Sequence, residues 1–301
     1  MPNNAYLRPG PHLIVLSDGS WKGRQDATVI GRLADALALS PGDDPHHRRR
    51  VFYDPGVAGI AGGLFGKGLA ANVRQAYSWL QDHHEPGAVI ILIGYSRGAF
   101  TVRSLAGMIG AAGLNLPTRD AWRAYRAGRS IEGLATHIAN LIAVDTVGAL
   151  GVPRGPISRR RNAFHDTSLG PHVLHALHIC AAHERRRAFQ PTHFEQSPRV
   201  VTEWFRGTHT DLGTSDRVYQ RIADELRAEG LSLGFAATPQ PVSEPKRVWK
   251  VARGLAWRAL EQGQVDHGAI EAARHLVAAG RGTPADRQII DRVANLYKWK
   301  A

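Results

Sequence analysis

The segment Gly94-Tyr95-Ser96-Arg97-Gly98 has the residue types of a nucleophile turn, in which a serine hydroxyl attacks a carbonyl carbon. The serine of such a turn has unfavourable backbone angles, and a Cβ at either glycine would collide with the neighbouring strand or helix. The apolar run 88–93 precedes the turn and a helical pattern at 100–112 follows it, as this motif requires. We therefore interpret Ser96 as a catalytic nucleophile. The alternative is a plain strand-to-helix crossover that contains a serine.

A serine hydroxyl is a weak nucleophile and needs a base, which an acid orients. In α/β hydrolases the chain order is serine, acid, histidine. Asp145 follows the buried run 139–144 and is the expected acid, although it could instead cap a turn. His209 follows the last expected strand and is the expected base, although the chain has 15 histidines. Asp211 is an alternative orienting group, or it anchors the loop that carries His209.

Acyl transfer also needs donors for the oxyanion, normally two backbone N–H groups. The residue after the nucleophile, Arg97, supplies the first in this fold, and the loop after an early strand supplies the second. Asp18-Gly19-Ser20 follows the first apolar run, so we expect the second donor from this loop, at Asp18 or Gly19, with Gly19 letting the backbone approach. We expect the Asp18 side chain to brace the nucleophile turn. A simple turn at 18–20 is the alternative.

The elements that must position these residues alternate along the chain. Apolar runs predict strands at 12–16, 51–53, 88–93, 139–144 and 200–205. Helical spacing predicts helices at 27–38, 69–80, 100–112, 174–187 and 218–229, with a glycine-rich loop at 56–68. This alternation is typical of an α/β fold. We expect an α/β-hydrolase-like architecture with a mostly parallel central sheet, helices on both faces and a helical C-terminal tail.

Eight short segments, in one order, resemble a known family. They are LSDGSW (16–21), YDPGV (53–57), LFGKGL (64–69), GYSRGAFTVRSLAGMIG (94–110), VDTVGALGVP (144–153), FHDTSL (164–169), HERRRAFQPT (183–192) and WFRGTHTDLG (204–213). Over roughly residues 13–233, the chain resembles the α/β-hydrolase family that supplies the catalytic domains of type VI secretion phospholipase effectors.

The resemblance implies a Ser–Asp–His triad and hydrolysis of ester bonds in membrane phospholipids. It supports Ser96 and His209 directly. Asp166, in the FHDTSL segment, is a second carboxylate between them and leaves the choice of Asp145 open. The sequence after His209 lacks the glycine-rich run of the family. The resemblance also implies a secretion-apparatus or immunity protein as a partner, and export by a signal-independent secretion system.

The chain changes character after Gly234, where a proline-containing stretch leads into basic amphipathic helices. We expect a catalytic domain at 1–235 and a basic helical extension at 236–301, acting as a lid or packed on the core. Basic residues with Trp249 and Trp257 suit a lipid interface. No signal peptide or membrane-spanning run is evident, so we expect cytoplasmic synthesis.

The net charge of +12 over 301 residues favours anionic partners. We expect a lipid or small ester substrate and peripheral contact with an anionic membrane. Nucleic acid is disfavoured because no recognition motif is visible. A hydrolase-like fold that binds anionic partners with little turnover is the alternative function. We expect no cofactor and no metal site: His46-His47 and His83-His84 are adjacent pairs that do not converge, and Cys180 is expected to be inert core in a helix.

Overall fold

A computed structural model describes residues 10–19, 28–39, 48–56, 65–129, 136–147, 168–184, 186, 189 and 191–233. The expected extension at 236–301 and the alternative acid Asp166 lie outside these ranges. Six parallel strands form one sheet in the order β2-β1-β3-β4-β5-β6. The strands are β1 (His12–Ser17), β2 (Arg49–Asp54), β3 (Val89–Tyr95), β4 (Ile138–Val144), β5 (Val173–Ala181) and β6 (Val200–Phe205).

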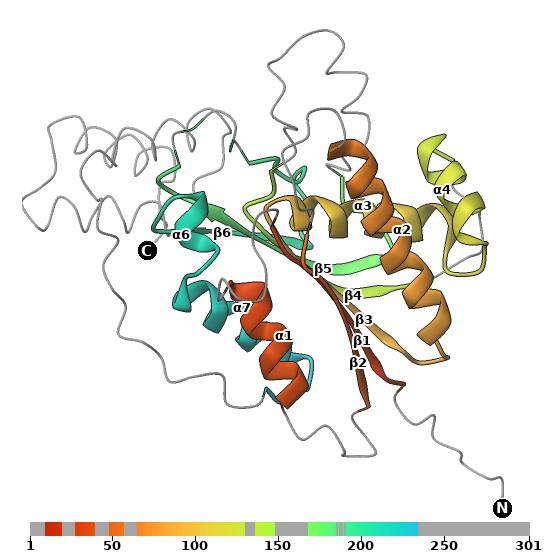
Figure 1. The fold of residues 1–301 in the computed structure, drawn as a ribbon, viewed down its shortest axis with the longest axis horizontal. Coiled ribbons are helices and arrows are strands. Elements are labelled where there is room, and N and C mark those ends of the chain that lie inside the picture. Colours follow the sequence, from red (N-terminus) through yellow and green to blue (C-terminus); the bar gives the residue numbers. More distant parts are fainter. Residues whose placement is uncertain are drawn as a thin grey trace, which may run out of the picture.

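Helices cover both faces of this sheet (Figure 1). On one face lie α2 (Phe65–His83), α3 (Arg97–Ala112) and α4 (Thr118–Arg126). On the other lie α1 (Val29–Leu39), α6 (His209–Leu212) and α7 (Asp216–Ala228). None of the described helices is both long enough and apolar enough to cross a membrane.

Strand residues alternate between the two cores, as the pleat requires. Leu13 and Val15 of β1 pack under α2 and α3, whereas Ile14 and Leu16 pack under α1 and α7. All four side chains are fully buried. Continuous apolar runs therefore mark the inner strands, because both faces of the sheet are covered.

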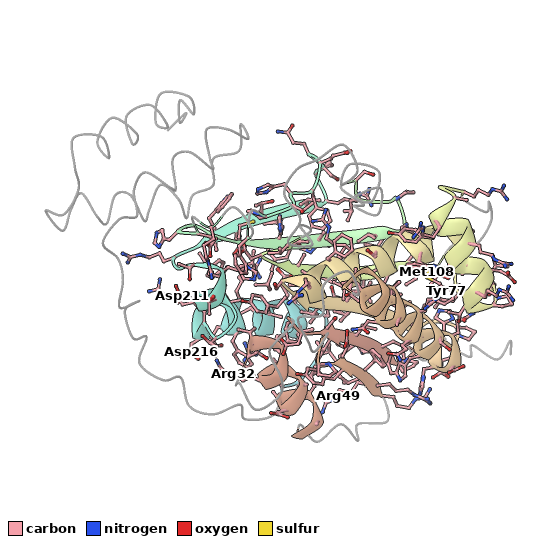
Figure 2. The ribbon with its side chains drawn as sticks, turned by 45° about the horizontal axis from the view of Figure 1, so that its top comes forward. Arg32, Arg49, Tyr77, Met108, Asp211 and Asp216 are labelled. Atoms are coloured by element: carbon pink, nitrogen blue, oxygen red, sulfur yellow. The ribbon has the colours of Figure 1, made fainter. Side chains whose placement is uncertain are left out.

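The two helices of the second face are also joined by charge. Arg32 of α1 and Asp216 of α7 form an ion pair with a nitrogen–oxygen distance of 2.7 Å, and Figure 2 labels both residues. Both side chains are about one-fifth exposed, so solvent weakens this pair and the apolar contacts carry most of the packing.

The structure corrects several expected elements. Residues 174–187 were expected to be helical, but Val173–Ala181 is β5, an inner strand. A short apolar run that is buried on both sides fits either period, which explains the error. Cys180 is buried, as expected, but on this strand. Helix α2 begins at Phe65, inside the expected loop 56–68.

Two further corrections concern loops. Helix α4 lies within residues 113–129, where no helix was expected. His209 was expected in a loop and is the first residue of the short helix α6.

The strand order places the chemistry at one edge of the sheet. The chain runs from β1 to β2 on one side and then crosses to β3 on the other side of β1. The carboxyl ends of β1 and β3 therefore flank a topological switch point, where ligands bind in open α/β sheets. Asp18 and Gly19 follow β1, and Ser96 follows β3.

Candidate active site

Ser96 occupies a sharp turn between β3 and α3. Its backbone has φ 59° and ψ −117°, a conformation that is unfavourable for a residue with a Cβ. A Cβ on Gly94 would collide with the backbone of Gly98, and one on Gly98 would collide with the Ser17 carbonyl group. The two glycines therefore allow β1, β3 and α3 to approach closely enough to hold the turn.

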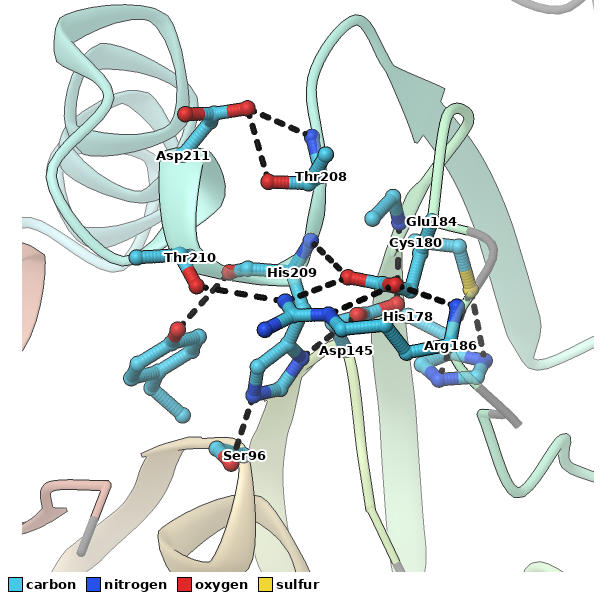
Figure 3. Close-up of polar contacts among 12 residues, drawn as sticks. Ser96, Asp145, His178, Cys180, Glu184, Arg186, Thr208, His209, Thr210 and Asp211 are labelled. Atoms are coloured by element: carbon cyan, nitrogen blue, oxygen red, sulfur yellow. Dashed lines mark hydrogen bonds and ion pairs between the residues drawn. The ribbon is translucent and has the colours of Figure 1, made fainter. Parts of the chain in front are cut away.

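The structure brings Ser96, His209 and Asp145 together in one hydrogen-bonded chain (Figure 3). His209 Nε2 lies 2.7 Å from Ser96 Oγ, and His209 Nδ1 lies 2.7 Å from Asp145 Oδ2. Exposure is 7% for Ser96, 3% for His209 and 0% for Asp145. The contacts are thus shielded from bulk water. Hydrogen bonds are electrostatically stronger in such a water-excluded site.

Asp145 is held by its own backbone and by β5. It has a φ of 43°, which is unusual for a residue other than glycine. Its N–H donates to the Ile179 carbonyl oxygen at 2.6 Å, and its Oδ1 accepts a hydrogen bond from the Ala181 N–H at 2.9 Å. One carboxylate oxygen is therefore fixed by the sheet while the other faces His209.

A capping box holds the helix that begins at His209. The Asp211 carboxylate accepts hydrogen bonds from the Thr208 N–H at 2.7 Å and from the Thr208 hydroxyl at 2.8 Å. Asp211 therefore anchors the turn that carries His209. Asp145, not Asp211, is the carboxylate that lies next to the imidazole.

Two aromatic rings flank the His209 imidazole. Tyr95 stacks on it with ring centroids 5.0 Å apart, and the Tyr95 hydroxyl donates to the His209 carbonyl oxygen at 2.7 Å. The Phe189 ring lies 4.8 Å from the imidazole, centroid to centroid. Tyr95 and Phe189 were not expected from the sequence, although Tyr95 lies within the nucleophile motif and Phe189 within the HERRRAF segment.

Glu184 fixes the backbone of the histidine. Its carboxylate accepts a hydrogen bond from the His209 N–H at 3.1 Å and forms an ion pair with Arg186 at 2.7 Å. The Glu184 side chain is 1% exposed. Burial alone would raise the pKa of Glu184, but hydrogen bonds from Arg186 and His209 outweigh it and lower the pKa to about 2. Sequence reasoning missed this residue as well.

Asp18 and Gly19 lie beside Ser96. A Cβ added to Gly19 would lie 3.4 Å from Ser96 Cβ. The Gly19 N–H donates to Asp18 Oδ1 at 2.7 Å, while Asp18 Oδ2 accepts from the Thr28 hydroxyl at 2.5 Å and the Tyr53 hydroxyl at 3.2 Å. Burial, opposed by these hydrogen bonds, raises the pKa of Asp18 to about 6. Arg97 is the first residue of α3, next to Ser96.

The described residues include one group with metal-ligand chemistry outside this chain of contacts. His178, Cys180 and His193 have donor atoms that all lie within 4.8 Å of one another. The sequence did not indicate this group, because Cys180 was expected on a helix and His193 is separated from it by twelve residues.

The parallel sheet, the helices on both faces and the turn after β3 define an α/β hydrolase. Residues 12–139 and 135–232 match the family described as the catalytic domain of Tle1-like type VI secretion phospholipase effectors. The chain belongs to this family.

Individual relatives are distant. An uncharacterized protein of Saccharomyces cerevisiae is 25% identical, and the match covers 65% of this chain and 34% of the relative. The chain thus spans about a third of that relative's length. A Tle1 effector bound to the VgrG spike of the type VI system is 15% identical, with a TM-score of 0.43, over 68% of this chain and 51% of the effector. An uncharacterized protein from Pseudomonas aeruginosa is 14% identical, with a TM-score of 0.45, over 97% and 62%.

Proposed function

We propose that this chain hydrolyses carboxylic esters of lipids, phospholipids in particular, through an acyl-enzyme formed on Ser96. Membership of the Tle1-like phospholipase family supports ester hydrolysis. The observation that carries the serine mechanism is the pair of 2.7 Å contacts that link Ser96 to His209 and His209 to Asp145.

In the proposed reaction, Ser96 Oγ attacks the ester carbonyl carbon as its proton passes to His209 Nε2. Asp145 stabilises the imidazolium that forms. The tetrahedral intermediate collapses, the ester C–O bond breaks, and His209 returns the proton to the leaving alcohol. A water molecule then attacks the acyl-serine by the same route, giving the free acid and restoring the Ser96 hydroxyl.

The proposed oxyanion donors are the N–H groups of Arg97 and Gly19. The Arg97 N–H stands at the positive end of α3, where negative charge is stabilised. The Gly19 N–H is bonded to Asp18 in the resting protein, so it must turn from the Asp18 carboxylate toward the substrate oxygen. Asp18 then retains its Thr28 and Tyr53 contacts and keeps the loop in place.

Phospholipid as the substrate class follows from the family, and the net charge of +12 suits an anionic membrane surface. A secretion-apparatus partner is proposed on the same basis, because the Tle1 effector has been seen bound to a VgrG spike. The phospholipid substrate and the secretion-apparatus partner both belong to this proposal.

A fluorophosphonate probe tests the nucleophile, with intact mass as the readout. We expect one probe per wild-type chain and no labelling of Ser96→Ala or His209→Ala. Ser104→Ala is the matched control, because Ser104 is a buried serine of the same helix α3 and should leave labelling unchanged. Absence of labelling in folded wild-type protein, or retention of labelling in Ser96→Ala, would contradict the mechanism.

Substrate class is tested separately on the active protein. Phosphatidylcholine and phosphatidylglycerol vesicles are compared with soluble short-chain esters, and released fatty acid is measured. Faster release from vesicles supports a phospholipase. Turnover of soluble esters alone would retain the serine mechanism and reject the lipid substrate.

A further inference from the structure

Two parts of the chain contribute the group of His178, Cys180 and His193. Strand β5 carries His178 and Cys180, and the segment after Pro191 carries His193. His178 and Cys180 are two residues apart on β5, so their side chains point to the same face of the sheet. The segment that leaves Pro191 brings His193 over them. The dashed lines in Figure 3 join the sulfur of Cys180 to the His178 ring.

Two members of the group have no exposure to solvent. Both His178 and Cys180 are 0% exposed. Among the described residues, Cys180 Sγ is the hydrogen-bonding partner of both His178 ring nitrogens, at 3.6 Å to Nδ1 and 3.5 Å to Nε2. A thiol is a weak partner for a buried imidazole, which elsewhere in proteins finds a carbonyl, a carboxylate or a metal ion.

We propose that His178, Cys180 and His193 bind a closed-shell metal ion with affinity for thiolate and imidazole, Zn²⁺ or Cu⁺. Metal–sulfur bonds of about 2.3 Å and metal–nitrogen bonds of about 2.0 Å place tetrahedral donor atoms about 3.5 Å apart. The Cys180 Sγ to His178 Nε2 distance of 3.5 Å already has this value. The remaining donor distances lie within 4.8 Å, so a shift of at most about 1.3 Å closes the site.

The two candidate ions differ in charge and in the number of ligands that they need. Arg103 lies close by, with its guanidinium 3.8 Å from the centroid of the Phe194 ring. Cu⁺ bound to a deprotonated Cys180 adds no net charge beside this buried cation. Zn²⁺ requires a fourth ligand such as water.

The position of the site predicts what the ion does. The Thr192 N–H donates to the Thr146 carbonyl oxygen at 2.8 Å, and Arg103 Nη1 donates to the Thr192 carbonyl oxygen at 2.5 Å. An ion bound by His193 and by the two β5 residues therefore cross-links the segment after Pro191 to β5, next to the turn that carries Asp145. It stabilises the support of the active site and takes no part in the ester chemistry.

The test uses the full chain, stripped of metal by a chelator in the presence of a phosphine reductant. Co²⁺ is the spectroscopic probe for the Zn²⁺ arm, and Cu⁺ is delivered from a competing chromophoric chelator in the other arm. We expect one ion per chain, a thiolate-to-cobalt charge-transfer band, and a higher thermal unfolding midpoint when the preferred ion is added. The arm with the tighter binding identifies the metal.

Cys180→Ser and His193→Gln should lose the charge-transfer band and the thermal shift. His137→Ala is the control, because His137 is an exposed histidine outside the group and its loss should change neither readout. Circular dichroism checks that each variant folds, and His193→Gln, at a half-buried position, decides the outcome if Cys180→Ser does not. Ser96→Ala should bind the ion normally, which separates this site from ester hydrolysis. Binding weaker than that of a free peptide thiol, or equal binding by His193→Gln, overturns the proposal.

Discussion

The buried carboxylate of Glu184 accepts a hydrogen bond from the His209 N–H, and in the same position it pairs with Arg186. The histidine is thereby held from three directions, since Tyr95 binds its carbonyl oxygen and Asp145 contacts its ring. A position fixed by backbone and ring together costs little reorganisation when the proton moves. The orientation of His209 thus depends on residues well outside the proposed catalytic chain.

Glu184→Gln removes the charge that holds Arg186 and weakens the hydrogen bond to His209. We expect kcat to fall about 10- to 100-fold, because His209 is the proposed general base and a small displacement of such a group has an effect of this size. Esterase kinetics measure the change, and probe labelling should slow in parallel. An unchanged kcat in a folded variant would show that Glu184 does not position His209.

The same residue predicts acid sensitivity. The pKa of Glu184 is lowered from 4.5 to about 2, so its contribution to folding is complete above pH 4.5 and is lost as the pH falls toward 2. Wild-type stability should decline across this window more steeply than that of Glu184→Gln. Chemical denaturation at a series of pH values measures the difference. If the free energies of unfolding of the two proteins change in parallel with pH, Glu184 is not an ionised, stabilising carboxylate in the folded protein.

The ionisation of Asp18 should change the stability of the protein in the opposite direction to that of Glu184. Its pKa is raised from 3.8 to about 6, so its stabilising protonated form is present below pH 3.8 and lost as the pH rises through 6. A difference of that size corresponds to about 3 kcal/mol. Relative to Asp18→Asn, the wild type should lose stability as the pH rises from 4 to 6. Asp35→Asn, at an exposed position in α1, should keep the wild-type slope.

The identity of the acid can be settled by three matched substitutions. Asp145→Asn should lower kcat by about 10³- to 10⁴-fold, as loss of the orienting carboxylate does in serine proteases. Asp211→Asn should disturb the cap of α6 and cost about 1 kcal/mol of stability while retaining most activity. Asp166→Asn should be nearly silent. A large loss in Asp166→Asn with full activity in Asp145→Asn would reverse the assignment.

Tyr95→Phe separates ring stacking from hydrogen bonding. It keeps the ring against His209 and removes the hydroxyl that donates to the His209 carbonyl oxygen. We expect a loss of about 1 kcal/mol in the free energy of unfolding and a lower kcat. Tyr77→Phe is the matched control, because the buried Tyr77 hydroxyl donates to the Gly113 carbonyl oxygen at 2.9 Å, in the helical layer. It should lose similar stability and leave kcat unchanged.

The sequence predicted the parts of the fold whose signals are local. The Ser96 turn could be predicted because glycines, a buried strand and a helix stand side by side in the chain. The sheet with helices on both faces followed from the alternation of elements. The strand β5 was missed because an apolar run covered on both faces has no distinctive period.

Contacts between distant segments were beyond sequence reasoning. Glu184, Phe189 and Tyr95 reach His209 only because β3, β5 and β6 end at one edge of the sheet. The His178–Cys180 pair became visible only once its strand period was known. His193 joins it through a return of the chain that no local pattern encodes.

Ser96 and Asp145 are the only described residues other than glycine with positive φ, and each such conformation costs about 1–3 kcal/mol. Glycine at either position would relieve that cost while removing a side chain of the proposed catalytic chain. At Ser96 a screen for heat tolerance alone would therefore favour an inactive protein, whereas at Asp145 glycine would also leave the buried Ala181 N–H without its acceptor. Evolution toward a more robust version of this domain must add stability elsewhere, and the helical layers far from the turn are where such changes are free to accumulate.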